Sequence, residues 1–206
     1  MISFLIPVSR KTFINSINSI LSKQFCFDKE IILCFNNNEL LNEENILLMN
    51  ELNIKWFINE ENWGSSYLKL YNKASMEYVY FLEDDDILLT NFSFLKNQYL
   101  KYDYFLGLYY PHKNMSFNDV FSIKKNEYFN ICNHSKLFKK YDTPEKLDDF
   151  QLGQLLIKKD VIKTIPKSDN KYNDYFLFKD NSGNIKNIKE YFYKQGYDGT
   201  NISIIT

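Results

Sequence analysis

Four consecutive carboxylates, Glu83 to Asp86, directly follow the apolar and aromatic segment YVYFL at residues 78–82. The β-branched and aromatic residues of this segment favour a buried strand that ends where the charges begin. If the extended backbone continues into the carboxylates, Glu83 and Asp85 point to one side and Asp84 and Asp86 to the other. Two such carboxylates can share a hard divalent cation, Mn²⁺ or Mg²⁺, which prefers oxygen ligands and relieves their repulsion. The alternative is a solvated acidic turn or a helix N-terminus, where Asp is favoured.

The segments before these carboxylates alternate between two patterns. Short apolar runs indicate strands buried on both faces, and they cover residues 2–8, 30–35, 54–58 and 78–82. Between them, apolar residues recur at helical spacing, with Thr12 as a plausible N-cap, over about 12–24, 42–52 and 65–75. Strand, helix and strand in succession form a right-handed crossover between parallel strands, and ligands of such a sheet bind at the carboxyl ends of its strands. The sequence therefore predicts an α/β fold with a central, mostly parallel sheet, and the carboxylates lie at its ligand-binding edge.

The second half of the chain is less regular. Its patterns predict an amphipathic helix over 90–103, a strand over 104–110, loops with short strands over 111–146, a helix over 144–162 and a strand around 175–179.

Composition limits the classes of protein that the chain can represent. Its 206 residues fit one domain with a sizeable core, and 25 basic against 26 acidic side chains exclude a general polyanion-binding surface. Cys26, Cys34 and Cys132 lack CxxC spacing, which favours buried free thiols in a reducing compartment over a disulfide or a zinc site. No apolar run approaches the roughly 20 residues that span a bilayer, and the first residues lack the charge order of a signal peptide. We therefore expect a cytoplasmic protein, in the host cytoplasm if a phage or virus encodes it.

Four segments, ISFLIPVSR, EIILCFNNN, NWGSSYLKLYNKA and YVYFLEDDD, resemble in order and spacing the nucleotide-sugar-binding half of glycosyltransferase family 2. Asn62 and Gly64 match the Asn-x-Gly element of that family. Residues 83–85 match its Asp-x-Asp metal motif, with Glu in the first position. The resemblance implies the GT-A fold, a Rossmann-like three-layer α/β/α domain. Residues 1–90 would then bind the nucleotide sugar, and residues 91–206 would bind the acceptor.

The resemblance also assigns a metal and the residues around it. Asp85 would be the direct ligand of Mn²⁺ or Mg²⁺, and Glu83 a second or water-mediated ligand. Asp84 would contact the ribose or the metal shell. Lys69, where relatives often have Arg, would face the base or the diphosphate, although an ordinary exposed helix lysine is equally compatible with the sequence. Trp63 is a candidate for stacking on a sugar or base.

The nucleobase site follows from the ends of the first two strands. Pro7, Val8 and Ser9 would flank the base. The acidic pair that the family carries after its second strand falls here on Phe35 and Asn36. An amide both donates and accepts hydrogen bonds, so Asn36 can contact a base, but the carboxylate that usually contacts uracil is absent. A UDP-sugar is the donor that the family favours, and this departure counts against it.

A second acidic pair, Asp148 and Asp149, lies in LDDFQLGQLL and resembles the pair that begins a helix beneath the reaction centre of the family. Asp149 matches the base that deprotonates the acceptor hydroxyl, which implies in-line displacement at the anomeric carbon with inversion of configuration. The dipole of a helix favours acidic residues in its first turn in any case. His112 and His134 lie in the irregular region, where a late histidine can be a metal ligand or incidental.

These residues favour a metal-dependent, inverting hexosyl- or pentosyltransferase that uses a nucleotide-diphosphate sugar. The acceptor would be a surface glycan or, if the protein is phage-encoded, a hydroxymethylated DNA base. Near-neutral charge counts against DNA, although a local basic groove would suffice to bind it. Two other readings stay open: a nucleotidyltransferase, which also sets carboxylates at a sheet edge, and an inactive relative that binds sugar nucleotides.

Overall fold

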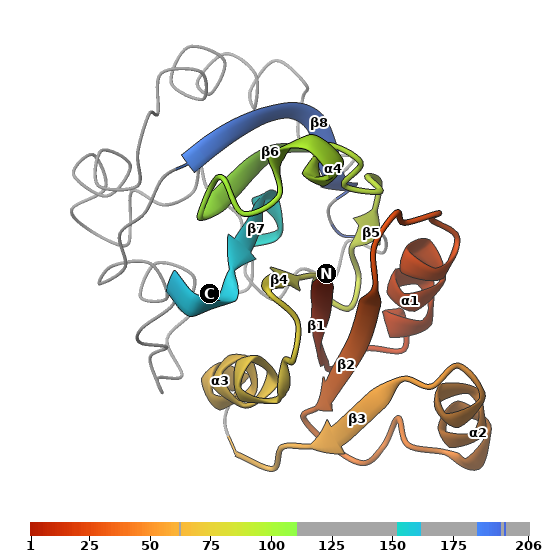
Figure 1. Cartoon of the computed structure of the whole chain (residues 1–206). Coiled ribbons are helices and arrows are strands. Elements are labelled where there is room, and N and C mark those ends of the chain that lie inside the picture. The colour runs from red at the N-terminus through yellow and green to blue at the C-terminus, as the bar shows by residue number, and fades with distance from the viewer. Residues whose placement is uncertain (62, 111–151, 162–184, 195, 197–206) are drawn as a thin grey trace.

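The computed structural model describes residues 1–61, 63–110, 152–161, 185–194 and Gly196 (Figure 1). Within these residues eight strands form one sheet in the order β3-β2-β1-β4-β7-β6-β8-β5. Four of the seven neighbouring strand pairs are parallel, and helices lie on both faces. The predicted α/β fold with a central, mostly parallel sheet is confirmed. In the described part of the chain, no helix is both long and apolar enough to cross a membrane.

The first half of the chain follows the predicted alternation closely. Its elements are β1 (Ile2–Val8), α1 (Phe13–Leu21), β2 (Lys29–Phe35), α2 (Glu43–Glu51), β3 (Lys55–Ile58), α3 (Trp63–Lys73) and β4 (Tyr78–Phe81). Strand β1 lies between β2 and β4, and all three are parallel. Thr12 precedes α1 as predicted, but its side chain makes no capping hydrogen bond. Asn42 does cap α2, because its side chain accepts the N–H of Asn45 at 2.8 Å.

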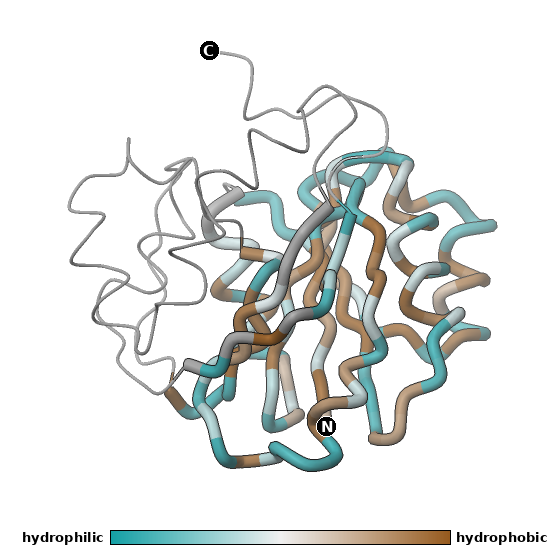
Figure 2. The backbone as a smooth tube through the Cα atoms, turned by 90° about the horizontal axis from the view of Figure 1, so that it is seen from above, coloured by the Kyte–Doolittle hydropathy of each residue, from teal (hydrophilic) through white to brown (hydrophobic). Residues whose placement is uncertain are grey.

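Alternate residues of the central strands form two cores. Phe4 and Leu33 are buried on the face that α1 covers, whereas Leu5 and Ile32 are buried on the other face with Leu70 of α3. The hydrophobic stretches accordingly run along the central strands, and hydrophilic stretches lie at the outer turns (Figure 2). A strand buried on both faces explains the continuous apolar runs in the sequence. The three layers hold the carboxyl ends of β1, β2 and β4 side by side at one edge.

The second half contains β5 (Ile87–Leu88), α4 (Leu95–Gln98), β6 (Tyr104–Tyr110), the 3₁₀ turn η2 (Leu152–Gln154), β7 (Leu155–Lys158), the 3₁₀ turn η3 (Lys159–Val161) and β8 (Ile185–Lys194). The helix predicted over 144–162 is wrong at residues 155–158, which form a strand between two short 3₁₀ turns. Strand β7 lies antiparallel between β4 and β6 and buries Leu155, Leu156 and Ile157. A short apolar run is compatible with a buried strand as well as with a helix. The periodicity of residues 155–158 alone therefore led to the wrong assignment.

The helix predicted over 90–103 is also mostly wrong, since only the four residues of α4 are helical. Phe92 and Leu100 have positive φ angles of 52° and 62°, which a right-handed helix does not permit. The N–H of Leu100 donates instead to the hydroxyl of Tyr78 at 3.1 Å. The strand over 104–110 is confirmed as β6, whereas β5 and β8 were not predicted. The loops predicted over 111–146 and the strand around 175–179 lie outside the described residues.

Gly107 of β6 faces the ring of Phe192 in β8. A Cβ at this position would lie 2.1 Å from Phe192 Cδ1, well inside the contact distance. Gly107→Ala should therefore lower the free energy of unfolding by about 1–3 kcal/mol, as overpacking of a core does. Gly153→Ala is the matched control, because its Cβ would lie 3.0 Å from Tyr193 Cε1 and needs only a small shift. Urea unfolding measures both, and a Gly107→Ala variant as stable as the wild type would contradict this packing.

Glu30 is a buried carboxylate at the amino end of β2. It accepts hydrogen bonds from Ser3 Oγ at 2.6 Å, from the Ser75 N–H at 2.6 Å and from Lys55 Nζ at 2.6 Å. Burial by itself raises the pKa of Glu30, but the hydrogen bonds from Lys55, Ser3 and Ser75 outweigh it and bring the pKa down to about 2. The folded protein therefore holds this proton less tightly than the unfolded chain does.

The stability from Glu30 is fully present above its ordinary pKa of 4.5 and is lost as the pH falls toward about 2. Glu30→Gln should lower the stability at pH 7 and reduce its decline between pH 4.5 and 2. Urea unfolding over this range measures the effect, with the exposed Glu39→Gln as control. An unchanged acid limb in Glu30→Gln would show that Glu30 does not contribute to it.

Candidate functional site

The four carboxylates form a turn directly after β4. The N–H of Asp86 donates to the carbonyl oxygen of Glu83 at 3.1 Å, so the extended backbone assumed for these residues ends before them. Asp84, Asp85 and Asp86 are at most 5% exposed, and Glu83 is half-buried. This burial rules out a solvated acidic turn and requires that other groups stabilise the charges.

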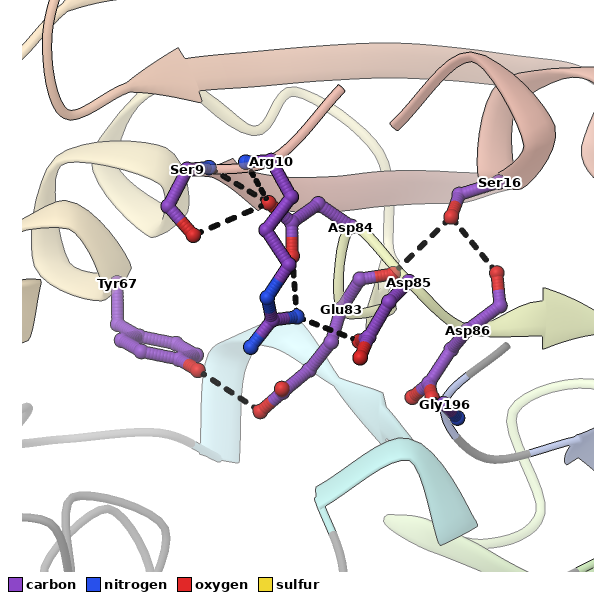
Figure 3. Close-up of polar contacts among 9 residues, drawn as sticks. All are labelled: Ser9, Arg10, Ser16, Tyr67, Glu83, Asp84, Asp85, Asp86 and Gly196. Carbon is purple, nitrogen blue, oxygen red and sulfur yellow. Dashed lines mark hydrogen bonds and ion pairs between the residues drawn. The ribbon is translucent and has the colours of Figure 1, made fainter. Parts of the chain in front are cut away.

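Asp84 joins the turn to the carboxyl end of β1 (Figure 3). Its Oδ2 accepts the backbone N–H groups of Ser9 and Arg10, both at 2.6 Å. Burial raises the pKa of the Asp84 carboxyl, and the Arg10 guanidinium and the two N–H groups limit that rise. Asp84 therefore fixes the loop after β1 in place, and its predicted contact to ribose or the metal shell would come in addition to this role.

The Arg10 guanidinium bridges two of the carboxylates. Its Nη1 lies 2.8 Å from Asp84 Oδ1 and 2.7 Å from Asp85 Oδ1. Sequence reasoning gave Arg10 no function, although one signal was available: it is the single arginine in a chain otherwise supplied with lysine. Arginine is preferred where a planar cation must contact several carboxylate oxygens in a desolvated place.

Asp86 connects the turn to α1 and to the residues after β8. Ser16 Oγ donates to the carbonyl oxygens of Asp86 at 2.7 Å and Glu83 at 3.2 Å. The Asp86 carboxylate accepts the N–H of Gly196 at 2.9 Å. Burial, and then the neighbouring carboxylates Glu83 and Asp85, raise the pKa of Asp86 well above its usual range, against the effect of Gly196. The Asp86 carboxylate therefore binds the backbone of a segment distant in sequence.

The pair of carboxylates that faces one cation is Asp84 and Asp85, not Glu83 and Asp85 as the extended backbone predicted. The turn directs Glu83 to Tyr67, whose hydroxyl lies 3.5 Å from Glu83 Oε1. Within the described residues, no three His, Cys, Asp or Glu side chains are arranged to hold a metal ion. The carboxylate oxygens of Asp85 are nevertheless of the ligand type that Mn²⁺ and Mg²⁺ prefer, although Arg10 Nη1 already lies 2.7 Å from one of them.

The predicted nucleobase residues lie at the same edge of the sheet. Pro7 and Val8 are buried in β1, with Val8 in the core on the α1 face, while Ser9 is half-buried beside Asp84. Asn36 follows β2, and its N–H donates to the carbonyl oxygen of Val8 at 3.0 Å. The structure thus brings the ends of β1 and β2 together with the carboxylate turn after β4.

Lys69 of α3 contacts protein groups at this edge. Its Nζ lies 2.6 Å from Asn59 Oδ1 and 3.0 Å from a carboxylate oxygen of Glu61. Trp63 and Gly64 are in the first turn of α3. Asn62, Asp149, His112 and His134 lie outside the described residues.

A mostly parallel sheet with helices on both faces and carboxylates at its carboxyl edge is the arrangement in which open α/β sheets bind ligands. Among solved structures, the chain is similar to S. aureus TarS residues 1–349, with a TM-score of 0.66 and 14% identity over 94% of this chain and 59% of that chain. TarS 1–349 in complex with UDP-GlcNAc aligns with a TM-score of 0.66 over 100% of this chain and 61% of that one. TarS 1–349 in complex with UDP gives a TM-score of 0.65.

The chain thus has the fold of TarS and spans about three fifths of the length of TarS 1–349, 59% in one alignment and 61% in another. No protein family model matches the chain, and no curated protein is similar to it in sequence.

Removal of Asp84 should destabilise the protein strongly. Asp84→Ala leaves the N–H groups of Ser9 and Arg10 without their acceptor, and it removes one of the two carboxylates that face the Arg10 guanidinium. Breaking a buried ion pair from one side costs about 3–5 kcal/mol. Urea unfolding measures this loss, with the exposed Asp28→Asn as control. A loss below about 1 kcal/mol, the level of a surface ion pair, would mean that Asp84 does not hold the loop after β1.

Proposed function

We propose that the chain is a metal-dependent, inverting glycosyltransferase that moves a hexosyl or pentosyl group from a nucleotide-diphosphate sugar to an acceptor hydroxyl. The observation that carries this proposal is the buried Asp84–Asp85 pair, which faces the Arg10 guanidinium at the carboxyl edge of β4 in a TarS-like fold. Ligands of open α/β sheets bind at this edge, where the order of the strands reverses. In this sheet the order of the strands reverses at β1. Strands β2 and β3 lie on one side of β1, and the next strand in the chain, β4, lies on its other side.

Residues 1–90 would bind the donor. Ser9 and Asn36, with Pro7 and Val8 beneath them, would form the base and ribose end of the site. Asn62 precedes α3 in the sequence, and Gly64 lies in the first turn of this helix. The first N–H groups of a helix can bind the negative charge of a diphosphate. The UDP and UDP-GlcNAc complexes of TarS support a nucleotide-sugar donor for this fold.

Asp85 would hold Mn²⁺ or Mg²⁺, with Glu83 as a second or water-mediated ligand. When bound, the ion neutralises the charge on the departing nucleoside diphosphate. The Arg10 guanidinium stabilises Asp84 and Asp85 through their ion pairs at 2.8 and 2.7 Å, which keeps the two carboxylates in place without the ion.

Asp149 would accept the proton of the acceptor hydroxyl as that oxygen attacks the anomeric carbon from the side opposite the diphosphate, with inversion of configuration. Asp149 stands three positions before Leu152 in the sequence. Strand β7 runs antiparallel to β4 with Leu156 opposite Tyr80, so its start and the preceding Leu152 lie at the same edge as the carboxylate turn. This location supports a base from this segment.

The acceptor would be a glycan hydroxyl, with a hydroxymethylated DNA base as the second choice. The near-equal numbers of 25 basic and 26 acidic residues favour the glycan, because duplex DNA is bound largely through phosphate contacts from Lys and Arg. Salt-dependent retention on duplex DNA would instead favour the DNA base.

Thermal unfolding with a panel of nucleoside diphosphates and their sugars, each with and without Mn²⁺, tests the function. A ligand that binds only the folded state raises the stability by about 2.7 kcal/mol at one hundred times its Kd. We expect a stabilisation that requires both the nucleotide and the metal, and Asp85→Asn should abolish its metal-dependent part. Asp149→Asn should keep donor binding and lose transfer by about 10²–10⁴-fold, the usual contribution of a general base.

Two results would contradict the proposal. If no nucleotide in the panel raised the melting temperature, the chain would not be a nucleotide-sugar enzyme. If Asp85→Asn responded to Mn²⁺ as the wild type does, the metal assignment would be wrong.

A further inference from the structure

The Arg10 guanidinium lies against the carboxylate that the proposed function assigns to a metal ion. Its Nη1 is 2.7 Å from Asp85 Oδ1 and 2.8 Å from Asp84 Oδ1, and Figure 3 shows it between these two side chains. A small divalent cation on Asp85 would lie about 2 Å from the carboxylate oxygen, beside the guanidinium. Two positive charges this close repel each other strongly where water is excluded. Arg10 and a metal ion therefore compete for Asp85.

Asp84 keeps other partners when the guanidinium moves. Its Oδ2 accepts the N–H groups of Ser9 and Arg10, both at 2.6 Å, and the Ser9 hydroxyl at 3.2 Å. None of these three donors belongs to the Arg10 side chain, so a rotation of that side chain leaves them in place. On Asp85, a metal ion would replace the positive charge that the guanidinium withdraws. Both buried carboxylates thus stay stabilised during the exchange, as their burial requires.

The backbone of Arg10 is fixed at the ligand-binding edge of the sheet. Its N–H is bound to Asp84, and residue 10 follows Val8, the last residue of β1, by two positions. The guanidinium therefore moves by rotation of its own side chain and stays near the carboxylate turn. In the proposed complex the diphosphate lies beside the metal ion, in the same place. A guanidinium suits a diphosphate well, because its planar N–H groups bind two phosphate oxygens at once.

We propose that Arg10 is an exchangeable cation, which pairs with Asp85 before ligands bind and transfers to the diphosphate of the donor when Asp85 binds the metal ion. Arg10 then lowers the affinity for the metal ion alone and raises the affinity for the nucleotide once the metal is bound. The two ligands are thereby coupled, and the metal binds tightly only together with the nucleotide. This inference rests on the proposed function, because it assumes that Asp85 holds a metal ion in contact with a nucleoside diphosphate.

The test compares the whole chain with its Arg10→Gln variant, which removes the charge and leaves a shorter polar side chain. Mn²⁺ binding without nucleotide is measured from the electron paramagnetic resonance signal of the free ion. Nucleotide binding at saturating Mn²⁺ is measured by isothermal titration calorimetry with UDP, CDP, ADP and GDP, and the nucleotide that the wild type binds most tightly serves for the comparison.

Arg10→Gln should change the two affinities in opposite directions. A charged hydrogen bond changes an affinity by about tenfold to 100-fold, so the variant should bind Mn²⁺ alone more tightly by about this factor. It should bind the nucleotide more weakly by a similar factor, because no guanidinium is left to contact the diphosphate. A variant whose site is merely damaged would bind both ligands more weakly.

Lys11→Gln is the matched control, because it removes the same charge from the adjacent, exposed residue. Exposed charges contribute little, so both affinities of this variant should stay within about twofold of the wild type.

A second measurement uses the wild type and does not depend on the variant. Arg10 is the single arginine of the chain, so a proton–nitrogen correlation spectrum contains one guanidinium Nε–H signal. This signal should shift when Mg²⁺ and the nucleotide are added together. With Mg²⁺ alone at the same concentration it should stay near its original position, because Arg10 then still holds Asp85.

Mn²⁺ binding by Arg10→Gln that equals or falls below that of the wild type would overturn the inference, and so would an unchanged nucleotide affinity. An Nε–H signal that does not move when both ligands are bound would overturn it as well. The proposed function survives each of these results, provided that nucleotide binding by the wild type still requires Mn²⁺. If the wild type binds none of the four nucleotides, the proposed function fails and this inference fails with it.

Discussion

The buried charge of the turn at residues 83–86 is the constraint on which the rest of the site depends. Three successive aspartates without solvent require partners, and the partners come from elements far apart in the sequence: the loop after β1, helix α1 and Gly196 after β8. Each partner binds a different carboxylate or carbonyl of the turn. The acidic segment therefore fixes the carboxyl ends of the parallel strands relative to one another, while Arg10 keeps two of its charges paired.

The same edge carries a second polar system of opposite character. Around the turn, carboxylates are neutralised by donors, whereas between α3 and β2 a chain of hydrogen bonds leads from Lys69 to the amide of Asn36. A nucleoside diphosphate has matching ends, with a phosphate group that needs positive charge or a metal and a base that needs directional hydrogen bonds. The two systems lie at the same edge of the sheet and depend on different residues.

The first half of the fold, from β1 to β4, was predicted correctly from the sequence, because there the local apolar pattern matches the burial of each element. Strands β1, β2 and β4 are buried on both faces, so their apolar runs indicated strands, and the apolar residues of α1 recur at helical spacing. Strand β7 was mistaken for a helix because its leucines fit both patterns, and only its place between β4 and β6 decides the matter. The helix after β5 was overpredicted because positive φ angles at Phe92 and Leu100 cannot be read from apolar spacing.

The position of the four carboxylates was predicted correctly, whereas the geometry predicted for them was wrong. The four carboxylates were placed at the correct edge, but the expected pairing of Glu83 with Asp85 assumed an extended backbone that the Glu83–Asp86 hydrogen bond interrupts. The contacts of Arg10 depend on the adjacency of β1 and β4, which are separated by more than sixty residues of sequence. Long-range adjacency of this kind follows only from the assembled sheet.

The central claim is that Asp85 holds the divalent cation to which a nucleoside diphosphate binds. The most direct measurement is a crystal structure of the chain with Mn²⁺ and its tightest-binding nucleoside diphosphate, with the metal located by anomalous scattering. The account predicts an anomalous peak within about 2.0–2.6 Å of an Asp85 carboxylate oxygen, in contact with the diphosphate. A bound nucleotide elsewhere, with Asp85 still paired to Arg10 and no peak beside it, would contradict the account.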